Sequence, residues 1–459
     1  MQKVILETIK KYNLFEKNKS IIVAVSGGAD SMALLHFMKY FATNHQLRLV
    51  VAHVNHKKRI NSDLDEILVE KVARMYNLPY EVYYLPKNDQ TENFHEYARN
   101  KRYEFFKSVA NHYQADCLVT AHHADDHLET QLHRLLYQNT SSGLIGIEPI
   151  TINHGLKIVR PLISITKQEI YRYCEAEGVL FREDESNESD VYTRNRIRKY
   201  IVPSLVNESS SIYEHSRMIS EQLSEDEAYF SEQVDQLMQF VSQGKEDCSV
   251  SRSFVQKLPP SLAKRLIKRL LQRFTIKDIQ TIHIEKIYRL IKNDKPNLIL
   301  ALPHQINCVI AYDVVKFSTI PTIEIDYEMV LSLDAKTILP TGSIINAREK
   351  KVDEKTEKSC INKVHLCYNE IELPLKVRTR RPGDRIQLMN GYGSKKVKEI
   401  MIESKVPKLL RNTWPIITDA NDQIIWIPLL KKSSLCQQQV EGHIITIDYC
   451  HRGGNEKDA

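Results

Sequence analysis

The sequence predicts an α/β protein. Its N-terminal domain is expected to be a doubly wound, mostly parallel sheet, followed by a helical domain and a smaller mixed α/β domain. Strand-like and helix-like segments alternate through the first two hundred residues, as in parallel strands joined by crossover helices. Long helical periods with few strand signals fill residues 206–295, and β-type patterns dominate from about residue 326. We therefore expect three domains, over 1–205, 206–325 and 326–459.

The alternation in the N-terminal domain can be followed element by element. The apolar run 21–25 (IIVAV) predicts a strand buried on both faces. Apolar residues at helical spacing follow over 31–43, and the same alternation then repeats along the chain. Further strands are expected at 47–54, 80–85 and 116–121, and further helices at 62–77, 93–114 and 125–137.

The other two domains are predicted from helical periodicity and strand patterns. Helical spacing over 218–242 and 261–274 predicts helices of the second domain, and strand-like patterns return at 297–318. A linker is expected within 319–330. The segment 348–362 (AREKKVDEKTEKSCI) is highly charged, which predicts a mobile loop in the third domain.

Composition and cysteine usage exclude several classes of protein. Hydrophobic residues make up 42% and charged residues 27% of the 459-residue chain, as in ordinary folded domains. No stretch approaches the roughly 18 apolar residues of a membrane span, and the lysine-containing N-terminus lacks the apolar core of a secretory signal. The eight cysteines form no C-x-x-C pair, so neither a thiol redox pair nor a zinc ribbon is indicated. We expect a cytoplasmic protein with no membrane partner.

The loop Ser26-Gly27-Gly28-Ala29-Asp30-Ser31 carries the predicted chemistry, because it lies between a buried strand and a helix. Its glycines let the backbone turn sharply and approach an anion closely. The N–H groups at the start of the following helix favour negative charge, and both serine hydroxyls would add donors. A carboxylate here would repel phosphate unless a cation lies between them, so Asp30 is assigned to Mg²⁺. A plain turn with a helix cap is the alternative.

Two further polar segments follow predicted strands, at the edge of the sheet where open α/β proteins bind ligands. The first contains His53, and the second, His122–Thr130, contains Asp125, Asp126 and Glu129. The second segment has three interpretations: a polar helix start that complements the helix dipole, a metal pair held by histidines and aspartates, or a nucleotide or substrate pocket. The position of the segment among the other motifs favours the pocket.

The loop resembles the S-G-G-x-D-S signature of the N-type ATP pyrophosphatases, or PP-loop enzymes, which cleave ATP between its α- and β-phosphates. Other motifs follow it in order: AHVNH, EYARNKRY, TAHHADDHLET, Arg160-Pro161-Leu162, YTRNRIR, RRPGDRIQL and Trp426-Ile427-Pro428. The series resembles the tRNA(Ile)-lysidine synthase family over the first 205 residues and again over 380–428. The sequence departs from the family pattern at Asn139–Ser142 and at Leu429.

The resemblance implies an ATP-dependent ligase that requires ATP and Mg²⁺. Such an enzyme joins L-lysine to C2 of the wobble cytidine of tRNA(Ile) with a CAU anticodon, through an adenylated tRNA, and changes decoding from AUG to AUA. The loop 26–31 and His53 would bind ATP. A carboxylate could accept the proton of the lysine amine and hold its charged ends. The candidates for catalysis and lysine binding are Asp125, Asp126, Glu129 and Arg99, the last with a solvated helix face as its alternative.

Positive charge is concentrated in residues 376–411, where eleven Lys or Arg residues stand against three acids. The net charge of this segment is +8, whereas that of the whole chain is +6. A clustered basic segment is typical of proteins that bind a phosphate backbone, although many such runs are only solvated surface. The tRNA-binding candidates are Arg380, Arg381, Arg385, Lys395 and Lys396 in this segment, and Arg194, Arg196 and Arg198 near the catalytic domain.

Two other functions compete with lysidine synthesis. A tRNA thiolation enzyme would share the loop but would need a cysteine nucleophile or cluster ligands, and no C-x-x-C pair is present. A non-catalytic RNA-binding module with a vestigial nucleotide site is the other alternative, and the intact Asp30 and loop serines argue against it. A homodimer is compatible with the sequence, which does not determine the oligomeric state.

Overall fold

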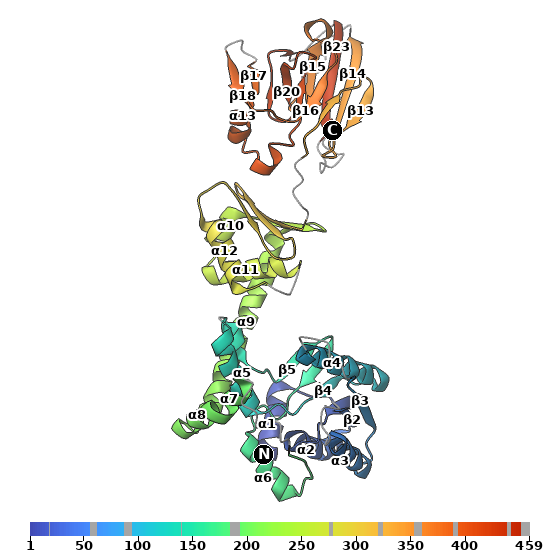
Figure 1. Cartoon of the computed structure of the whole chain (residues 1–459), viewed down its shortest axis with the longest axis vertical. Helices are drawn as coiled ribbons and strands as arrows, with labels where there is room; N and C mark the ends of the chain where they lie inside the picture. Colours follow the sequence, from blue (N-terminus) through green and yellow to red (C-terminus); the bar gives the residue numbers. More distant parts are fainter. Residues whose placement is uncertain are drawn as a thin grey trace. The chain divides into compact units, whose positions relative to one another are not determined.

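The computed structural model divides the chain into two compact units, Met1–Phe230 and Ser231–Ala459. Figure 1 shows the helices and strands of both. The residues that the structure describes are 1–17, 19–55, 62–86, 94–138, 140–183, 193–274, 279–319, 325–352, 360–388, 393–437 and 442–450. The three predicted domain boundaries stay predictions.

The first unit is built on a six-stranded sheet with the order β3-β2-β1-β4-β6-β5. Its neighbouring strands are parallel except for the β5–β6 hairpin, so the predicted mostly parallel sheet is confirmed. The strand order reverses between β1 and β4, because β2 and β3 lie on one side of β1 and β4 on the other. The strands are β1 (Ser20–Ala24), β2 (Arg48–Asn55), β3 (Tyr80–Tyr84), β4 (Cys117–Val119), β5 (Ile150–Asn153) and β6 (Leu156–Val159).

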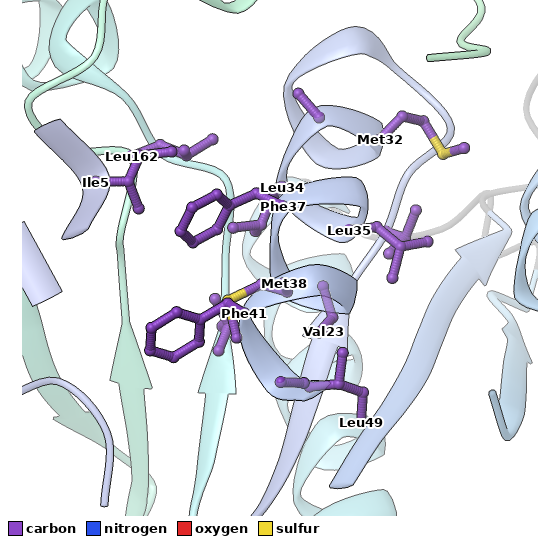
Figure 2. Close-up of a cluster of buried hydrophobic side chains, with 14 of the residues drawn as sticks. Ile5, Val23, Met32, Leu34, Leu35, Phe37, Met38, Phe41, Leu49 and Leu162 are labelled. Carbon is purple, nitrogen blue, oxygen red and sulfur yellow. The ribbon is translucent and has the colours of Figure 1, made fainter. Parts of the chain in front are cut away.

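Helices cover both faces of this sheet, since alternate strand residues point to opposite sides. Ile21 and Val23 pack into a cluster with Leu34 and Met38 (Figure 2), whereas Ile22 packs on the other face with apolar residues of α4. The helices are α1 (Gln2–Tyr12), α2 (Ala29–His45), α3 (Ser62–Met75), α4 (Phe94–Tyr113), α5 (Ala124–Tyr137), α6 (Lys167–Glu177), α7 (Thr193–Arg196), α8 (Val202–Glu208) and α9 (Ile212–Leu237). A 3₁₀ turn, η1 (Ser141–Ile145), and a π-helical turn, η3 (Ile197–Ile201), complete the unit.

The second unit begins with helices packed on a five-stranded antiparallel sheet with the order β7-β8-β11-β10-β9. The strands expected at 297–318 are confirmed, but β7 and β8 were not predicted. Only Cys248 and Val250 mark β8 as a strand, so its alternation is too short to identify. The elements are β7 (Ser242–Gln243), β8 (Asp247–Ser251), α10 (Arg252–Lys257), α11 (Pro260–Gln272), α12 (Thr281–Lys292), β9 (Asn297–Ala301), β10 (Asn307–Ala311) and β11 (Val314–Ser318).

The last part of the chain contains two sheets and one helix, α13 (Val397–Glu403). One sheet has the order β12-β16-β19-β20-β17-β18, with β21 paired to β20, and the other has the order β13-β14-β23-β15-β22. The strands are β12 (Glu328–Val330), β13 (Ala335–Ile338), β14 (Ile344–Val352), β15 (Lys363–Cys367), β16 (Lys376–Arg378), β17 (Arg385–Gln387), β18 (Ser394–Lys396), β19 (Ile416–Thr418), β20 (Ile424–Ile427), β21 (Lys431–Lys432), β22 (Cys436–Gln437) and β23 (Gly442–Cys450).

The mobile loop predicted at 348–362 is wrong in its first part. Strand β14 continues to Val352, and Arg348 pairs with Thr446 and Lys351 with His443 of β23. The pairing uses main-chain groups, so a run of charged side chains does not prevent it. Residues 353–359 of the predicted loop, and 320–324 of the predicted linker, lie outside the described residues. Over the described part of the chain, no helix is long and apolar enough to cross a membrane.

Candidate active site

A cavity of about 740 Å³ opens at the carboxyl ends of β1, β2 and β4. This is the point where the strand order reverses, which is where open α/β sheets bind ligands. Side chains from α3, α4, α5 and α7 complete its wall. The residues that line it are Ala24, Val25, Ser26, Asp30, Ser31, Ala52, His53, Val54, Asn55, Asp65, Ala98, Arg99, Arg102, Tyr103, Phe106, Thr120, Ala121, His122, Asp126, Arg194, Asn195 and Arg198.

The two glycines of the predicted phosphate loop have different structural roles. Gly27 has φ +95°, and a Cβ there would lie 3.2 Å from Asp65 Cβ, so this position requires glycine. Its carbonyl accepts the N–H of Arg182 at 3.0 Å, and Arg182 Nε donates to Asp65 at 2.9 Å. Gly28, with φ −77°, is the N-cap of α2. A Cβ on Gly28 would meet only Ser26 Oγ, at 3.7 Å, so the backbone of Gly28 is open to a ligand.

The serine at the end of the loop holds the loop together. Ser31 Oγ accepts the N–H of Ser26 at 3.0 Å and donates to the carbonyl of Gly28 at 3.1 Å. Both serines had been expected to donate to phosphate, but the one proton of Ser31 is used within the loop. The Ser26 hydroxyl lies 3.1 Å from Ser31 Oγ and donates to it, since the Ser31 proton goes to the Gly28 carbonyl. Ser26 also lines the cavity, so its hydroxyl can turn toward a phosphate oxygen.

Asp30 lies in the first turn of α2 and lines the cavity. Its Oδ1 atom is buried without a hydrogen-bond partner, and its Oδ2 atom lies 3.7 Å from His123 Nε2 and 3.9 Å from Lys167 Nζ. Among the described residues, no three His, Cys, Asp or Glu side chains are arranged to hold a metal ion. A single carboxylate with an unused oxygen does fit Mg²⁺, which commonly takes its other ligands from phosphates and water.

Two histidines, the buried His53 and the half-buried His122, face the cavity as neutral imidazoles. His53 Nδ1 donates to the carbonyl of Val25 at 2.8 Å, while its Nε2 atom is buried and unpartnered. Burial lowers the pKa of His53 below its usual value. His122 Nδ1 is hydrogen-bonded to Thr120 Oγ1 at 2.9 Å, and burial lowers the pKa of His122 to about 4. Both rings are therefore uncharged near pH 7.

A cluster of two acids and two arginines forms part of the cavity wall close to Asp30, since Asp30 Oδ2 and Asp126 Oδ2 lie 3.7 and 3.4 Å from the same atom, His123 Nε2. Arg194 and Arg198 donate to Asp126 Oδ1 at 3.2 and 3.3 Å, and both also bind Glu129. Asp126 lines the cavity, whereas Glu129 is fully buried behind it. Burial alone would raise the pKa of Asp126, but His123, 3.4 Å away, and the two arginines outweigh burial and lower the pKa. Asp126 therefore stays ionised.

Asp125 does not line the cavity, although it had been a candidate for catalysis and lysine binding. Its Oδ1 atom accepts the hydroxyl of Tyr213 at 2.7 Å, and its Oδ2 atom accepts the N–H of Lys167 at 2.8 Å. Asp125 thus ties α5 to α9 and to the start of α6. His127 also points elsewhere, since its Nδ1 atom accepts the N–H of Ile147 at 3.2 Å.

Two arginines of α4 line the cavity, and only one of them had been predicted. Arg99 lies with its guanidinium 5.4 Å from the ring centre of Tyr103. Arg102, which the prediction missed, has a buried Nε atom with no hydrogen-bond partner in the described structure, and burial lowers its pKa. The spacing of three residues puts both on one side of a helix, and this was the signal available in EYARNKRY. An unpartnered guanidinium in a cavity wall is suited to binding an anion.

Arg196 had been grouped with Arg194 and Arg198 as a tRNA-binding residue. The structure separates them, because Arg196 does not line the cavity. Its Nη2 atom donates to Thr193 Oγ1 at 2.9 Å on the exposed side of α7.

The predicted tRNA-binding residues of the basic segment lie on the surface of the second unit, and most have a partner there. Arg380 donates to Asn412 at 2.9 Å, and Arg385 donates to Ser394 at 2.7 Å. Arg381 pairs with Asp422 and Glu328, and Lys395 with Glu403. Lys396 is exposed on β18. Surface ion pairs of this kind are weak and can be exchanged for phosphate contacts.

Arg378 corrects the simple count of charges in the basic segment. Its side chain is 2% exposed and pairs with Asp384 at 2.9 Å and with Asp422 at 2.7 Å. Arg378, one of the eleven cations, is therefore held in a buried ion pair and cannot contact a nucleic acid.

Comparison with known proteins agrees with this geometry. Residues 1–205 match the family model described as a PP-loop domain, and residues 375–448 match the TilS substrate C-terminal domain. The fold and the cavity thus define a PP-loop, ATP-utilising enzyme. A tRNA(Ile)-lysidine synthase of Bacillus subtilis (strain 168) is 35% identical over 446 residues, which are 94% of this chain and 94% of that protein. The chain belongs to the tRNA(Ile)-lysidine synthase family.

Two further similarities cover the whole chain and its C-terminal part. A tRNA(Ile)-lysidine synthase of Bacillus cereus (strain ATCC 14579) is 33% identical over 442 residues, 93% of this chain and 91% of that protein. A crystal structure of a TilS C-terminal domain is 34% identical, covers 28% of this chain and 100% of that chain, and has a TM-score of 0.27.

Proposed function

We propose that this chain ligates L-lysine to C2 of the wobble cytidine of tRNA(Ile) with a CAU anticodon, and that ATP is cleaved to AMP and pyrophosphate. One observation carries the proposal. A single cavity is lined by the open glycine loop, by Asp30 and by an ionised Asp126 that binds two arginines. An ATP-dependent ligation needs both a phosphate site and a site for a charged second substrate in reach of each other.

The loop and His53 form the proposed ATP site. The backbone at Gly28 and the first turn of α2 present N–H donors to the phosphates, and Ser26 adds a hydroxyl. Asp30 would hold Mg²⁺, which when bound neutralises charge on the pyrophosphate leaving group. Attack by the cytosine O2 atom on the α-phosphorus then forms the O–P bond and releases pyrophosphate.

The acid–arginine wall forms the proposed lysine site, and the structure changes the roles expected of its carboxylates. Asp126 has a lowered pKa, so it suits binding of an ammonium group rather than acceptance of its proton. His122 lines the same cavity, but with a pKa of about 4 its ring is a weak proton acceptor, so we assign it to contact with the substrate, and the amine releases its proton to solvent. The deprotonated lysine amine attacks C2, the C–N bond forms, and AMP leaves with the O2 atom.

The arginines of α4 supply binding sites for anionic groups. Arg102 has no partner within the described structure, and Arg99 lies three residues before it on the same helix. We assign them to the carboxylate of lysine or to the α-phosphate of ATP, since both are anions that must enter this cavity.

We propose that basic residues on the surface of the second unit bind the tRNA backbone: Arg381, Arg385 and Lys396, which are exposed, and Arg380 and Lys395, which are half-buried. The domains expected over 206–325 and 326–459 are proposed to contact the tRNA outside the anticodon. We also propose a cytoplasmic location and a homodimer.

The decisive experiment is mass spectrometry of nucleosides from tRNA(Ile) after incubation with the protein, ATP, Mg²⁺ and lysine. Lysidine should form only when all components are present. The Asp30→Ala variant should release neither AMP nor pyrophosphate, while Glu7→Ala, on the exposed side of α1, should behave as wild type.

The same experiment tests the rival thiolation reaction. No described residue that lines the cavity is a cysteine, which disfavours a thiolation nucleophile there. A thiolated nucleoside in place of lysidine, or wild-type AMP release by Asp30→Ala, would overturn the proposal.

A further inference from the structure

The short helix α7 and the π-helical turn η3 that follows it have two functional faces. Arg194 of α7 and Arg198 of η3 point to the acids of the cavity wall. On the other side, Thr193 Oγ1 accepts a hydrogen bond from Arg196 Nη2 at 2.9 Å and lies 3.3 Å from the hydroxyl of Tyr137. Helices α5 and α7 lie side by side (Figure 1). The surface formed by Tyr137, Thr193 and Arg196 therefore borders the cavity directly, because Arg194 and Asn195 line it.

Tyr137 presents an exposed aromatic ring at this surface. It is the last residue of α5 and is 63% exposed. Its hydroxyl and the guanidinium of Arg196 both lie next to Thr193 Oγ1, so an aromatic ring and a cation stand beside each other at the border of the cavity. The ring of His133 lies 4.9 Å from the Tyr137 ring, so aromatic area is continuous there.

The positive charge of this surface and the continuity of the RNA chain indicate that it binds a nucleotide. A cytidine that enters the cavity is part of a polynucleotide, so its neighbours must lie on the surface at the cavity mouth. An exposed aromatic face offers stacking to an unpaired base, and a nearby guanidinium offers contact to its phosphate. A π-helical turn, η3, follows α7, and such turns are frequent at functional sites.

We propose that Tyr137, Thr193 and Arg196 form a platform for a nucleotide adjacent to the target cytidine. The base stacks on the Tyr137 ring, and Arg196 contacts the backbone phosphate. Thr193 is a positioning residue that orients both side chains through its hydroxyl. This inference rests on the proposed function, since it takes the substrate to be a base in single-stranded RNA.

The test uses the full-length protein and two tRNA(Ile) transcripts that carry 2-aminopurine, one on each side of the target cytidine. Stacking on an aromatic ring quenches 2-aminopurine, so wild-type protein should quench one of the two transcripts. Tyr137→Ala should abolish the quenching and raise the KM for tRNA by about tenfold, with the KM for ATP unchanged. Tyr137→Phe should retain the quenching, because the ring remains.

Controls separate this proposal from the proposed function and from simple unfolding. Tyr40→Ala removes a tyrosine that is 61% exposed on α2 and should change neither quenching nor KM. Arg196→Gln should lower tRNA affinity and reduce its salt dependence by about one phosphate contact. If wild type makes lysidine but Tyr137→Ala matches it in quenching and in KM for tRNA, the platform does not exist. If wild type makes no lysidine, the proposed function fails instead.

Discussion

Arg198 forms a bidentate ion pair with Glu129, whose carboxylate is 1% exposed. Its Nε atom donates to one carboxylate oxygen at 2.6 Å and its Nη2 atom to the other at 2.9 Å. Arg194 Nε donates to the same carboxylate at 3.1 Å. An ionised carboxylate is stable at such depth only when it is paired and hydrogen-bonded. The pair therefore holds α7 and η3 against α5 and sets the position of both arginines in the cavity wall.

Replacement of Glu129 by Gln tests this arrangement. The amide keeps the size of the side chain but leaves two half-buried guanidinium groups without their main anion. We expect a loss of about 3 kcal/mol in the free energy of unfolding. Lysidine formation should fall by about a hundredfold, because groups that line the cavity are displaced. Denaturant unfolding and single-turnover assays measure the two effects.

A second substitution provides the control for Glu129→Gln. Adding Arg198→Met removes the uncompensated charge, so the double variant should regain part of the lost stability without regaining activity. A single variant as stable as wild type would show that the ion pair does not support this wall.

The two loop glycines give a matched pair of substitutions. Gly27→Ala should destabilise the first unit by about 1–2 kcal/mol, because an L-residue is strained at φ +95°, and it should also abolish AMP release. Gly28→Ala should leave the melting temperature within about 2 °C of wild type, since φ −77° suits alanine and the added methyl meets only Ser26 Oγ. That methyl should nevertheless raise the KM for ATP by at least about tenfold.

Thermal unfolding and initial rates at varied ATP measure both loop variants. Equal ATP affinity in Gly28→Ala and wild type would contradict a phosphate cradle at this backbone.

Much of the catalytic unit follows from local sequence pattern. Buried strands such as 21–25 and the loop after them are marked by residues adjacent in the chain, so the sheet and the loop were predicted correctly. The choice between Asp125 and Asp126 was not predictable in the same way. Consecutive residues on a helix point about 100° apart, and only the contact of Asp125 with Tyr213, 88 residues later, decides which one faces the cavity.

Counting charges in the sequence has the same limit in the second unit, because it does not show which cations are buried. Arg378 stands in a basic run and looks no different from Arg380 in sequence. Its burial depends on Asp422, 44 residues away, so charge counting could not separate a core cation from a surface one. Arg102 was missed for a related reason. Its guanidinium is buried and unpartnered only because the cavity forms around it, and the sequence of the helix alone does not show this.

Arg378 and Lys396 should therefore respond oppositely to substitution by alanine. Arg378→Ala leaves Asp384 and Asp422 without their shared cation and should cost about 3–5 kcal/mol of unfolding free energy. Lys396→Ala should leave stability unchanged, lower tRNA affinity and reduce the slope of log affinity against log salt by about one. Filter binding at several salt concentrations measures the second effect. Unchanged affinity and slope for Lys396→Ala would remove this residue from the tRNA interface.

His122 predicts a specific dependence of stability on pH. Burial lowers the pKa of His122 to about 4 in the folded protein, from the ordinary histidine value of 6.5. Below pH 6.5 the unfolded chain binds a proton at this ring that the folded protein does not bind. The stabilisation is therefore complete above pH 6.5 and is lost as pH falls toward 4, with a limiting slope of about 1.4 kcal/mol per pH unit.

Substitution of His122 by Gln should remove this contribution, so the unfolding free energy of the variant should fall less steeply between pH 6.5 and 4. The exposed His215→Gln variant is the control and should keep the wild-type slope. Catalysis should respond little, because a ring with a pKa of about 4 is a weak proton acceptor. Single-turnover lysidine formation by His122→Gln at pH 8 should stay within about tenfold of wild type. A loss of about 10²-fold or more would show that His122 accepts the amine proton, and a wild-type stability slope would show that the ring is not desolvated in the folded protein.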